Sequence, residues 1–190
     1  MLKGRLEAFS DGVIAIIITI MVLELKVPQG TTAQALHPLI PIFISYMFSF
    51  IFIGIYWNNH HHLLHAAKKI SGRILWANHH LLFWLSLVPF VTAWMGENHP
   101  AVIPASCYGV VLLMAGIAYY GLAHELIREN GPNSDIALAL GKDYKGVVST
   151  VLYACAIPLA FVSVWISYVI YIGVAVMWFI PDQRIEKHLP

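Results

Sequence analysis

Charged residues are scarce in this sequence of 190 residues, of which only 11% are Asp, Glu, Lys or Arg and 59% are hydrophobic. Soluble domains carry about 25% charged and about 45–50% apolar residues. The shortage excludes an ordinary soluble domain and indicates an integral membrane protein, in agreement with a mean hydropathy of +0.72. The formal net charge of +1, with no basic patch, also excludes a nucleic-acid partner and leaves the lipid bilayer as the expected surrounding.

Two other features are missing. The only two cysteines, Cys107 and Cys155, lie within apolar runs, which excludes a disulfide framework and a CxxC metal site. No small-x-small cleavage site follows Leu23, and Asp11 interrupts the flank of the first apolar run. We therefore interpret that run as a retained membrane span and not as a signal peptide.

Long apolar runs predict the membrane-spanning helices, each of which needs about 20 mainly apolar residues. Four runs suit one span each and lie at about residues 6–25, 38–64, 74–95 and 103–127. A fifth run, residues 146–180, is too long for one span and short for two. The polar stretch at residues 128–145 carries turn signals, and a short surface helix is expected at residues 135–140.

Basic residues predict the direction of the chain. They flank alternate loops, whereas Glu97 and His99 flank the other side; the basic residues are Lys3, Arg5, Lys68, Lys69, Arg73, Arg128, Lys142 and Lys145. The positive-inside rule places the N-terminus in the cytoplasm. Arg184 and Lys187 should lie there too, which requires an even number of spans. Dividing the last run near residues 164–167 gives a single domain, 1–190, that is an all-α integral membrane protein with six transmembrane helices and both termini cytoplasmic.

A polar group precedes the first uninterrupted apolar run, residues 12–23. Arg5, Ser10 and Asp11 lie close enough to the bilayer to be unfavourable without partners, since a carboxylate at its centre costs about 2.5–3.5 kcal/mol. They form either an ordinary cytoplasmic helix start, where an acidic residue is favourable, or a buried polar network, which we favour. Candidate partners come from the inner ends of the second and third spans, and they are Trp57, Asn58, His60, His61, Asn78 and His79.

The same helix carries a stripe at helical spacing that contains Phe9, Gly12, Ile16, Thr19, Ile20 and Leu23. Most aliphatic stripes are packing faces, and the alternative is a pore wall. No Thr-Val-Gly-Tyr-Gly loop occurs in the chain. If the protein conducts ions, a carbonyl filter cannot be assumed, and the available device is a hydrophobic constriction that gates by dewetting.

The pattern Arg5-x-x-x-Phe9-Ser10-Asp11, followed by an aliphatic helix with Thr19 and by Leu23-Glu24-Leu25, resembles the transmembrane protein 175 family of potassium channels. The length and the number of spans fit prokaryotic members. The resemblance implies a potassium-permeable homotetramer in the cell membrane, with the first helix of each subunit lining a central pore. It also implies residue roles: Ile16 forms the constriction, Thr19 contributes selectivity, Ile20 and Leu23 line the pore, and a polar network that includes Arg5, Phe9, Ser10 and Asp11 ties this helix to its neighbours.

Histidines suggest an alternative. His61 and His65 are four residues apart and could chelate a metal, and His60, His62, His79 and His80 lie nearby in sequence. A histidine-dependent metal-binding membrane enzyme is therefore an alternative function, and an ion-coupled transporter is another. Because His124-Glu125 is the sole other cluster, we favour packing or pH-sensing histidines, and expect no metal, no cofactor and no enzyme activity, with K⁺ only as the permeant ion.

Overall fold

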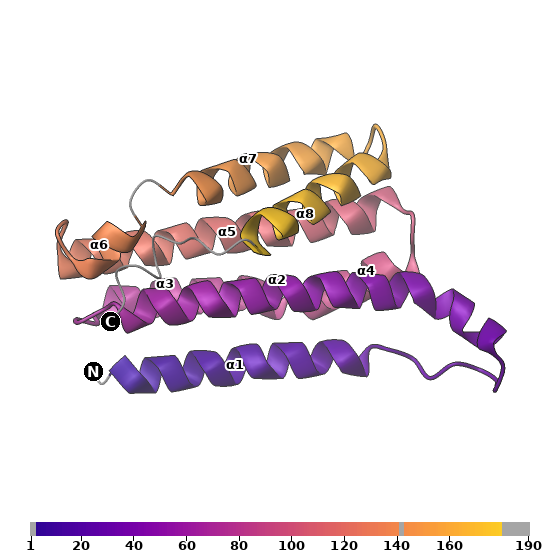
Figure 1. Ribbon diagram of the computed structural model, residues 1–190, viewed down its shortest axis with the longest axis horizontal. Coiled ribbons are helices and arrows are strands. Elements are labelled where there is room, and N and C mark those ends of the chain that lie inside the picture. Colours follow the sequence, from indigo (N-terminus) through magenta and orange to yellow (C-terminus); the bar gives the residue numbers. More distant parts are fainter. Residues whose placement is uncertain (1–2, 141–142, 180–190) are drawn as a thin grey trace.

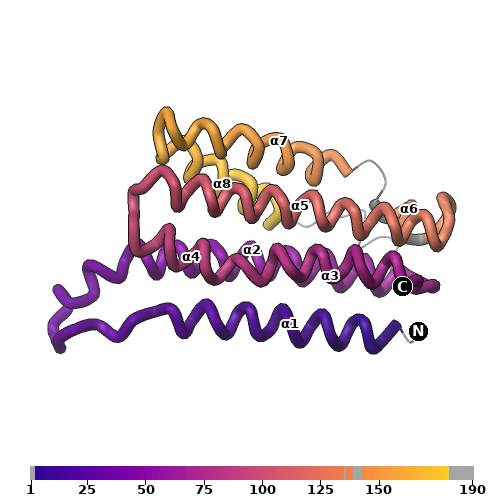
Figure 2. Tube along the Cα trace, turned by 180° about the vertical axis from the view of Figure 1, so that it is seen from behind, coloured from indigo at the N-terminus to yellow at the C-terminus, as the bar shows by residue number. Residues whose placement is uncertain are grey.

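The computed structural model describes residues 3–140 and 143–179, and within these residues all regular structure is helical (Figure 1). Four helical segments are long and apolar enough to cross a membrane: Lys3–Leu23, Ala33–His65, Gly72–Glu97 and Val102–Asn130. They run along the long axis of the molecule in both views (Figures 1 and 2). The all-α membrane architecture is confirmed, whereas the number of six spans stays a prediction.

The first two spans are joined by a segment that ends in a short 3-10 helix. This helix, η1 (Ala33–Leu39), lies between α1 (Lys3–Leu23) and α2 (Ile40–His65) and takes in Pro38, which we had placed at the start of the second span. Pro41 occupies the first turn of α2, where its missing N–H has no helical partner to lose. The predicted span at residues 38–64 therefore agrees with α2 to within two residues.

The third predicted span, residues 74–95, is divided in the structure. It consists of α3 (Gly72–Ser86) and α4 (Val88–Glu97), with a break at Leu87. Pro89 has no N–H to donate to the carbonyl of Leu85, so the helical ladder is interrupted one turn before it. The Leu87 N–H donates instead to the Trp84 carbonyl at 3.2 Å, and the Thr92 hydroxyl donates to the Val88 carbonyl at 2.6 Å. The two helices nevertheless form one membrane-length segment.

α5 (Val102–Asn130) lies in the middle of the bundle and contacts α3, α4 and α7. Its buried side chains include small ones such as Ala105 and large ones such as Tyr108. Gly109 makes room for Tyr171 of α8 (Val164–Phe179), because a Cβ at this position would overlap the Tyr171 hydroxyl. That hydroxyl donates to the Ala105 carbonyl at 2.9 Å. α5 is therefore the packing centre of the fold.

The apolar run at residues 146–180 forms a helical hairpin of α7 (Tyr144–Leu159) and α8. The chain reverses at residues 160–163, slightly before the predicted division at 164–167, because α7 ends one residue after Pro158. The Ser167 hydroxyl donates to the Ala156 carbonyl at 2.6 Å and joins the two helices. Each has 16 residues, so each is about 24 Å long and shorter than a hydrocarbon core of about 30 Å.

Loop residues at one end of the bundle complete the fold. α6 (Asp135–Leu140) is the short helix predicted at residues 135–140. It lies at the end of the bundle where α1 begins (Figure 1). Lys142, Arg184 and Lys187 fall outside the described residues, so the cytoplasmic position of both termini stays a prediction.

Candidate functional site on the first helix

One face of α1 packs into the subunit. Its buried side chains recur every three or four residues, as a helical stripe requires, and they are Leu6, Ser10, Ile14, Ile17 and Met21. The helix contacts α2, α3 and α4. Within this otherwise apolar stripe, Ser10 is the polar member, so its hydrogen bonds must be made inside the protein.

Another face of α1 is exposed in the single subunit. The exposed fractions of its apolar side chains are 58% for Ile16, 41% for Ile20 and 80% for Leu23, and Thr19 between them is exposed as well. The Thr19 hydroxyl donates to the Ile16 carbonyl at 2.9 Å, which leaves the lone pairs of the oxygen as acceptors. All the residues predicted to line a pore therefore lie on the exposed part of α1.

A buried chain of three side chains connects α1 with α3 and α2. Ser10 Oγ donates to the Leu6 carbonyl and accepts from Asn78 Nδ2, each at 2.9 Å. Asn78 Oδ1 lies 2.7 Å from His60 Nε2. Since an amide oxygen can only accept, His60 donates from Nε2. Ser10 and Asn78 are 0% exposed and His60 is 1% exposed, so these hydrogen bonds are buried within the subunit.

Asp11 makes a second link between α1 and α2. Trp57 Nε1 donates to Asp11 Oδ1 at 2.9 Å. Trp57 is exposed and Asp11 is partly buried. A hydrogen bond to a charged acceptor contributes more than a neutral one, about 1.5–3 kcal/mol in typical cases. The Asp11 carboxylate, which directly precedes the apolar run at residues 12–23, therefore has a specific partner in the Trp57 indole.

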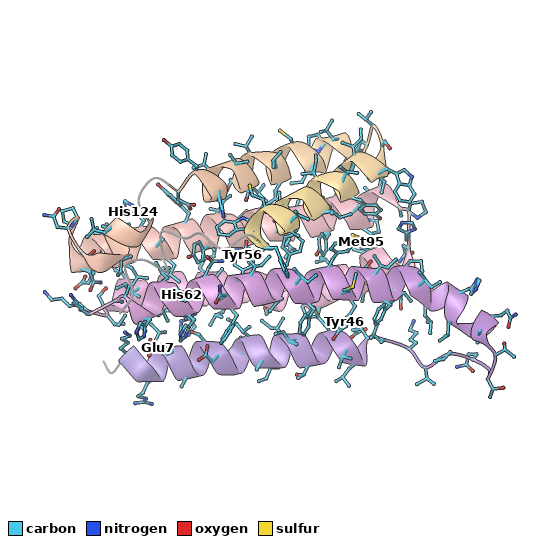
Figure 3. The ribbon with its side chains drawn as sticks, viewed as in Figure 1. Glu7, Tyr46, Tyr56, His62, Met95 and His124 are labelled. Carbon is cyan, nitrogen blue, oxygen red and sulfur yellow. The ribbon has the colours of Figure 1, made fainter. Side chains whose placement is uncertain are left out.

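Aromatic contacts surround these hydrogen bonds. Phe9 of α1 stacks on His79 of α3, with ring centroids 5.4 Å apart. His61 stacks on Trp57 at 5.8 Å and holds the indole from the side of α2. The end of α1 is further tied to α2 by Lys3, which donates to the His65 carbonyl at 2.6 Å and pairs with Glu7 at 3.7 Å. Glu7 lies at this end of α1 (Figure 3).

Two residues of the predicted network lie apart from it. Arg5 and Asn58 are both exposed. Among the residues that the structure describes, no hydrogen bond or ion pair joins Arg5 to Asp11, to Ser10 or to a histidine. The structure therefore brings together Phe9, Ser10, Asp11, Trp57, His60, His61, Asn78 and His79, whereas Arg5 is exposed and is not hydrogen-bonded to any of them.

The histidines do not form an evident metal centre in the described part of the chain, where no three His, Cys, Asp or Glu side chains are grouped to hold an ion. His61 and His65, the predicted chelating pair, stack with ring centroids 6.0 Å apart and planes 19° from parallel. His60 is bonded to Asn78. These rings pack and hydrogen-bond, and no specific arrangement favours the metal-enzyme interpretation.

An ion pair at the other end of α1 was not predicted. Lys26, just after α1, lies 2.5 Å from Glu97 at the end of α4. The hydrogen bond to Glu97, followed by its charge, raises the pKa of Lys26 above the usual value of 10.5. The signal in the sequence was the placement of opposite charges at the same end of the first and third spans. Glu97 and Glu24 also line an open groove of about 670 Å³ between α1 and α4, whose wall includes Ile16 and Ile20.

The sequence is similar to those of known proteins. Residues 5–89 match the family described as "Endosomal/lysosomal potassium channel TMEM175". The chain is 53% identical over 189 residues to a potassium channel of Chryseobacterium sp. (strain P1-3), covering 100% of this chain and 98% of that one. It is 35% identical over 179 residues to a potassium channel of Chamaesiphon minutus, covering 86% and 87%.

The comparison of folds supports the same family. It is similar to the crystal structure of a lysosomal potassium-selective channel TMEM175 homolog from Chamaesiphon minutus, with a TM-score of 0.81, 33% identity, and coverage of 93% of this chain and 96% of that one. The matched family and these relatives are ion channels, a class that is not enzymatic. The chain belongs to the TMEM175 family, as the resemblance in α1 had predicted.

Proposed function

We propose that this protein is a potassium-permeable cation channel of a prokaryotic cell membrane, the function named for its relatives. Four subunits assemble around an axis, and α1 of each lines the central pore. Each subunit crosses the membrane six times with both termini in the cytoplasm, α7 and α8 being the fifth and sixth spans. The observation that carries the proposal is the exposed face of α1, with Ile16 58% and Leu23 80% exposed, in a chain of this family.

Assembly has a physical reason. A single α1 cannot enclose a pore, whereas copies related by a closed symmetry can surround one. Exposed Ile16, Ile20 and Leu23 leave a long apolar face for this purpose. The number four comes from the family. A native mass spectrum in mild detergent should show the tetramer, and a protein that is only monomeric would contradict the assembly.

The constriction follows from side-chain chemistry. A ring of Ile16 side chains would remove water from an ion without offering it a polar substitute, so the barrier to permeation would lie at that level. Thr19 follows less than one turn later, and its hydroxyl oxygen keeps lone pairs free to accept while its proton bonds to the Ile16 carbonyl. Discrimination of K⁺ from Na⁺ would then depend on the difference in dehydration energy at Ile16 and on the Thr19 oxygen.

The polar network has the role of a positioning device. It holds Ser10 against α3 and α2 and so sets the rotation of α1 about its own axis. With Ser10 inward, Ile14 and Ile17 also point inward, and Ile16 is left on the exposed face. Asp11 and Trp57 strengthen the same anchor from the side.

Potassium flux tests the function. Purified protein in liposomes with a potassium gradient should release K⁺ faster than protein-free liposomes of the same lipid. Replacement of internal K⁺ by Na⁺ should slow the flux without abolishing it. Flux no greater than that of protein-free liposomes, from protein that elutes as a single oligomer, would exclude the channel proposal.

A further inference from the structure

A second cavity lies away from α1, between α2, α5 and α7. Its volume is about 270 Å³, far more than the roughly 10–15 Å³ that a single water needs. Apolar and aromatic residues supply most of the wall, including Phe52, Ile117, Val151 and Tyr153. Tyr56, which lies between α2 and α5 in Figure 3, contributes from the side of α2 that is turned away from α1. The cavity is therefore separate from the candidate pore.

A glycine keeps this cavity open. Gly116 of α5 faces the gap between α2 and α7, and a Cβ built there would lie 3.7 Å from the Tyr56 hydroxyl and 3.8 Å from Thr150 Oγ1. These are ordinary van der Waals distances, so alanine fits. A longer side chain would extend from α5 into the cavity itself. Phe52 and Tyr153 form its buried inner end, each 3% exposed.

The cavity opens outward, between α5 and α7. Residues along this opening are substantially exposed: Ile117 42%, Tyr120 60%, Val147 58% and Val151 56%. In a membrane-embedded bundle an apolar surface of this kind faces hydrocarbon. The space is therefore a groove that suits the acyl chain of a lipid.

One acidic residue lines the mouth of the groove, and one basic residue lies beside it. Asp143 lines it and accepts a hydrogen bond from the Gly146 N–H at 2.9 Å, and a carboxylate has further lone pairs to offer. Lys145 lies two residues away, with its ammonium 5.9 Å from the ring centroid of Trp178, which also lines the groove. Tryptophan and tyrosine are typical of the level of lipid head groups. A zwitterionic head group matches one acid and one base at that level.

We propose that this groove binds one acyl chain of a phospholipid whose head group is phosphoethanolamine, with the ammonium of the lipid at Asp143 and its phosphate at Lys145. The lipid comes from the leaflet at the end of the bundle where α7 begins. This site is independent of ion conduction and would exist whatever ion the protein carries.

Native mass spectrometry of delipidated protein tests the proposal. The protein is titrated with phosphatidylethanolamine or phosphatidylglycerol that carry the same acyl chains. Each wild-type subunit should bind one phosphatidylethanolamine, about fivefold more tightly than phosphatidylglycerol. Gly116→Leu should weaken the binding of both lipids by about tenfold, because its side chain would occupy the space of the acyl chain. Gly173→Leu is the matched control, because its Cβ meets nothing within 4 Å on the exposed surface of α8.

Two further variants separate the parts of the proposal. Val151→Phe narrows the groove from an exposed position on α7 and serves if Gly116→Leu does not fold. Asp143→Asn keeps the helix cap and should reduce the preference for phosphatidylethanolamine to about one. Equal lipid binding by Val151→Phe, Gly116→Leu and Gly173→Leu would overturn the chain site. Equal affinity of wild type for both lipids, lost in Gly116→Leu, would overturn the head-group assignment.

Discussion

α1 and α5 are both long apolar helices, yet different forces hold them in the bundle. Of the most apolar window of each helix, 50% is buried in α5 and only 28% in α1. α5 is held by close packing, as at Gly109 and Tyr171. α1 is held near its N-terminus by hydrogen bonds of Ser10 and Asp11 and beyond its C-terminus by the ion pair of Lys26 with Glu97. α5 is therefore the packing centre of the subunit. α1 is positioned against the bundle and leaves one face exposed, the face that we propose lines the pore.

The largest effect on stability is expected in α5. Gly109→Ala places a Cβ onto the hydroxyl of the buried Tyr171, and we expect a cost of about 3 kcal/mol or more, at the upper end of the usual range for overpacking. The melting temperature in detergent should fall strongly. Gly121→Ala, on the same helix, meets nothing within 4 Å and should be neutral. Tyr171→Phe in the Gly109→Ala background should recover part of the loss, and equal melting temperatures of the two glycine variants would refute the packing account.

The next effect is expected in the buried network. Asn78→Leu removes the partner of both Ser10 and His60, and each unsatisfied buried group costs about 1–3 kcal/mol. We expect a loss of about 2–3 kcal/mol in the free energy of unfolding, together with a weaker tetramer. Asn58→Leu is the control, because Asn58 is exposed on α2. If both variants unfold alike, Asn78 does not anchor α1.

A smaller effect is expected at Asp11. Asp11→Ala removes the acceptor of Trp57 Nε1 and should cost about 1.5 kcal/mol, the lower end of the range for a hydrogen bond to a charged group, because Trp57 is exposed. Asp11→Asn keeps an amide oxygen as acceptor and should be milder. Size-exclusion profiles and flux of the two variants measure the effect. A normal tetramer with normal flux for Asp11→Ala would show that the carboxylate does not position α1.

The smallest effect is expected at the exposed ion pair. Lys26→Gln should lower the melting temperature only slightly, since both partners are in contact with solvent. Because the pKa of Lys26 is raised above 10.5 in the folded state, the contribution is fully present below pH 10.5 and is lost as the pH rises through the raised pKa. The difference between wild type and variant should therefore be constant from about pH 7 to about pH 9 and should shrink above 10.5. A difference that disappears at neutral pH would contradict this reading.

Much of the fold and part of the candidate site could be predicted from the sequence. Apolar runs locate the spans to within a few residues, because hydrocarbon thickness dictates their length. Residue types at the inner ends of the second and third spans also indicated Asn78, His60 and Trp57 as partners, since polar groups at membrane depth need them. The division at Leu87 was missed because a proline inside an apolar run does not reveal whether its helix bends or breaks.

Other details depend on geometry that a sequence does not contain. Arg5 has a long side chain that can reach several neighbours or point to solvent, and the structure leaves it exposed. The pairing of Lys26 with Glu97 requires α1 and α4 to be neighbours, which hydropathy alone does not establish. The groove at Gly116 depends on which faces of three helices meet.

The most direct test of the central claim concerns Ile16. Potassium flux through liposomes, at equal amounts of tetramer, is measured for wild type, Ile16→Asn and Ile16→Phe, and for the same two substitutions at Val169, which is 69% exposed on α8. A constriction formed by Ile16 predicts that asparagine raises the flux, that phenylalanine abolishes it, and that neither change at Val169 has an effect. Equal flux through wild type and both Ile16 variants would contradict the assignment of α1 as the pore helix.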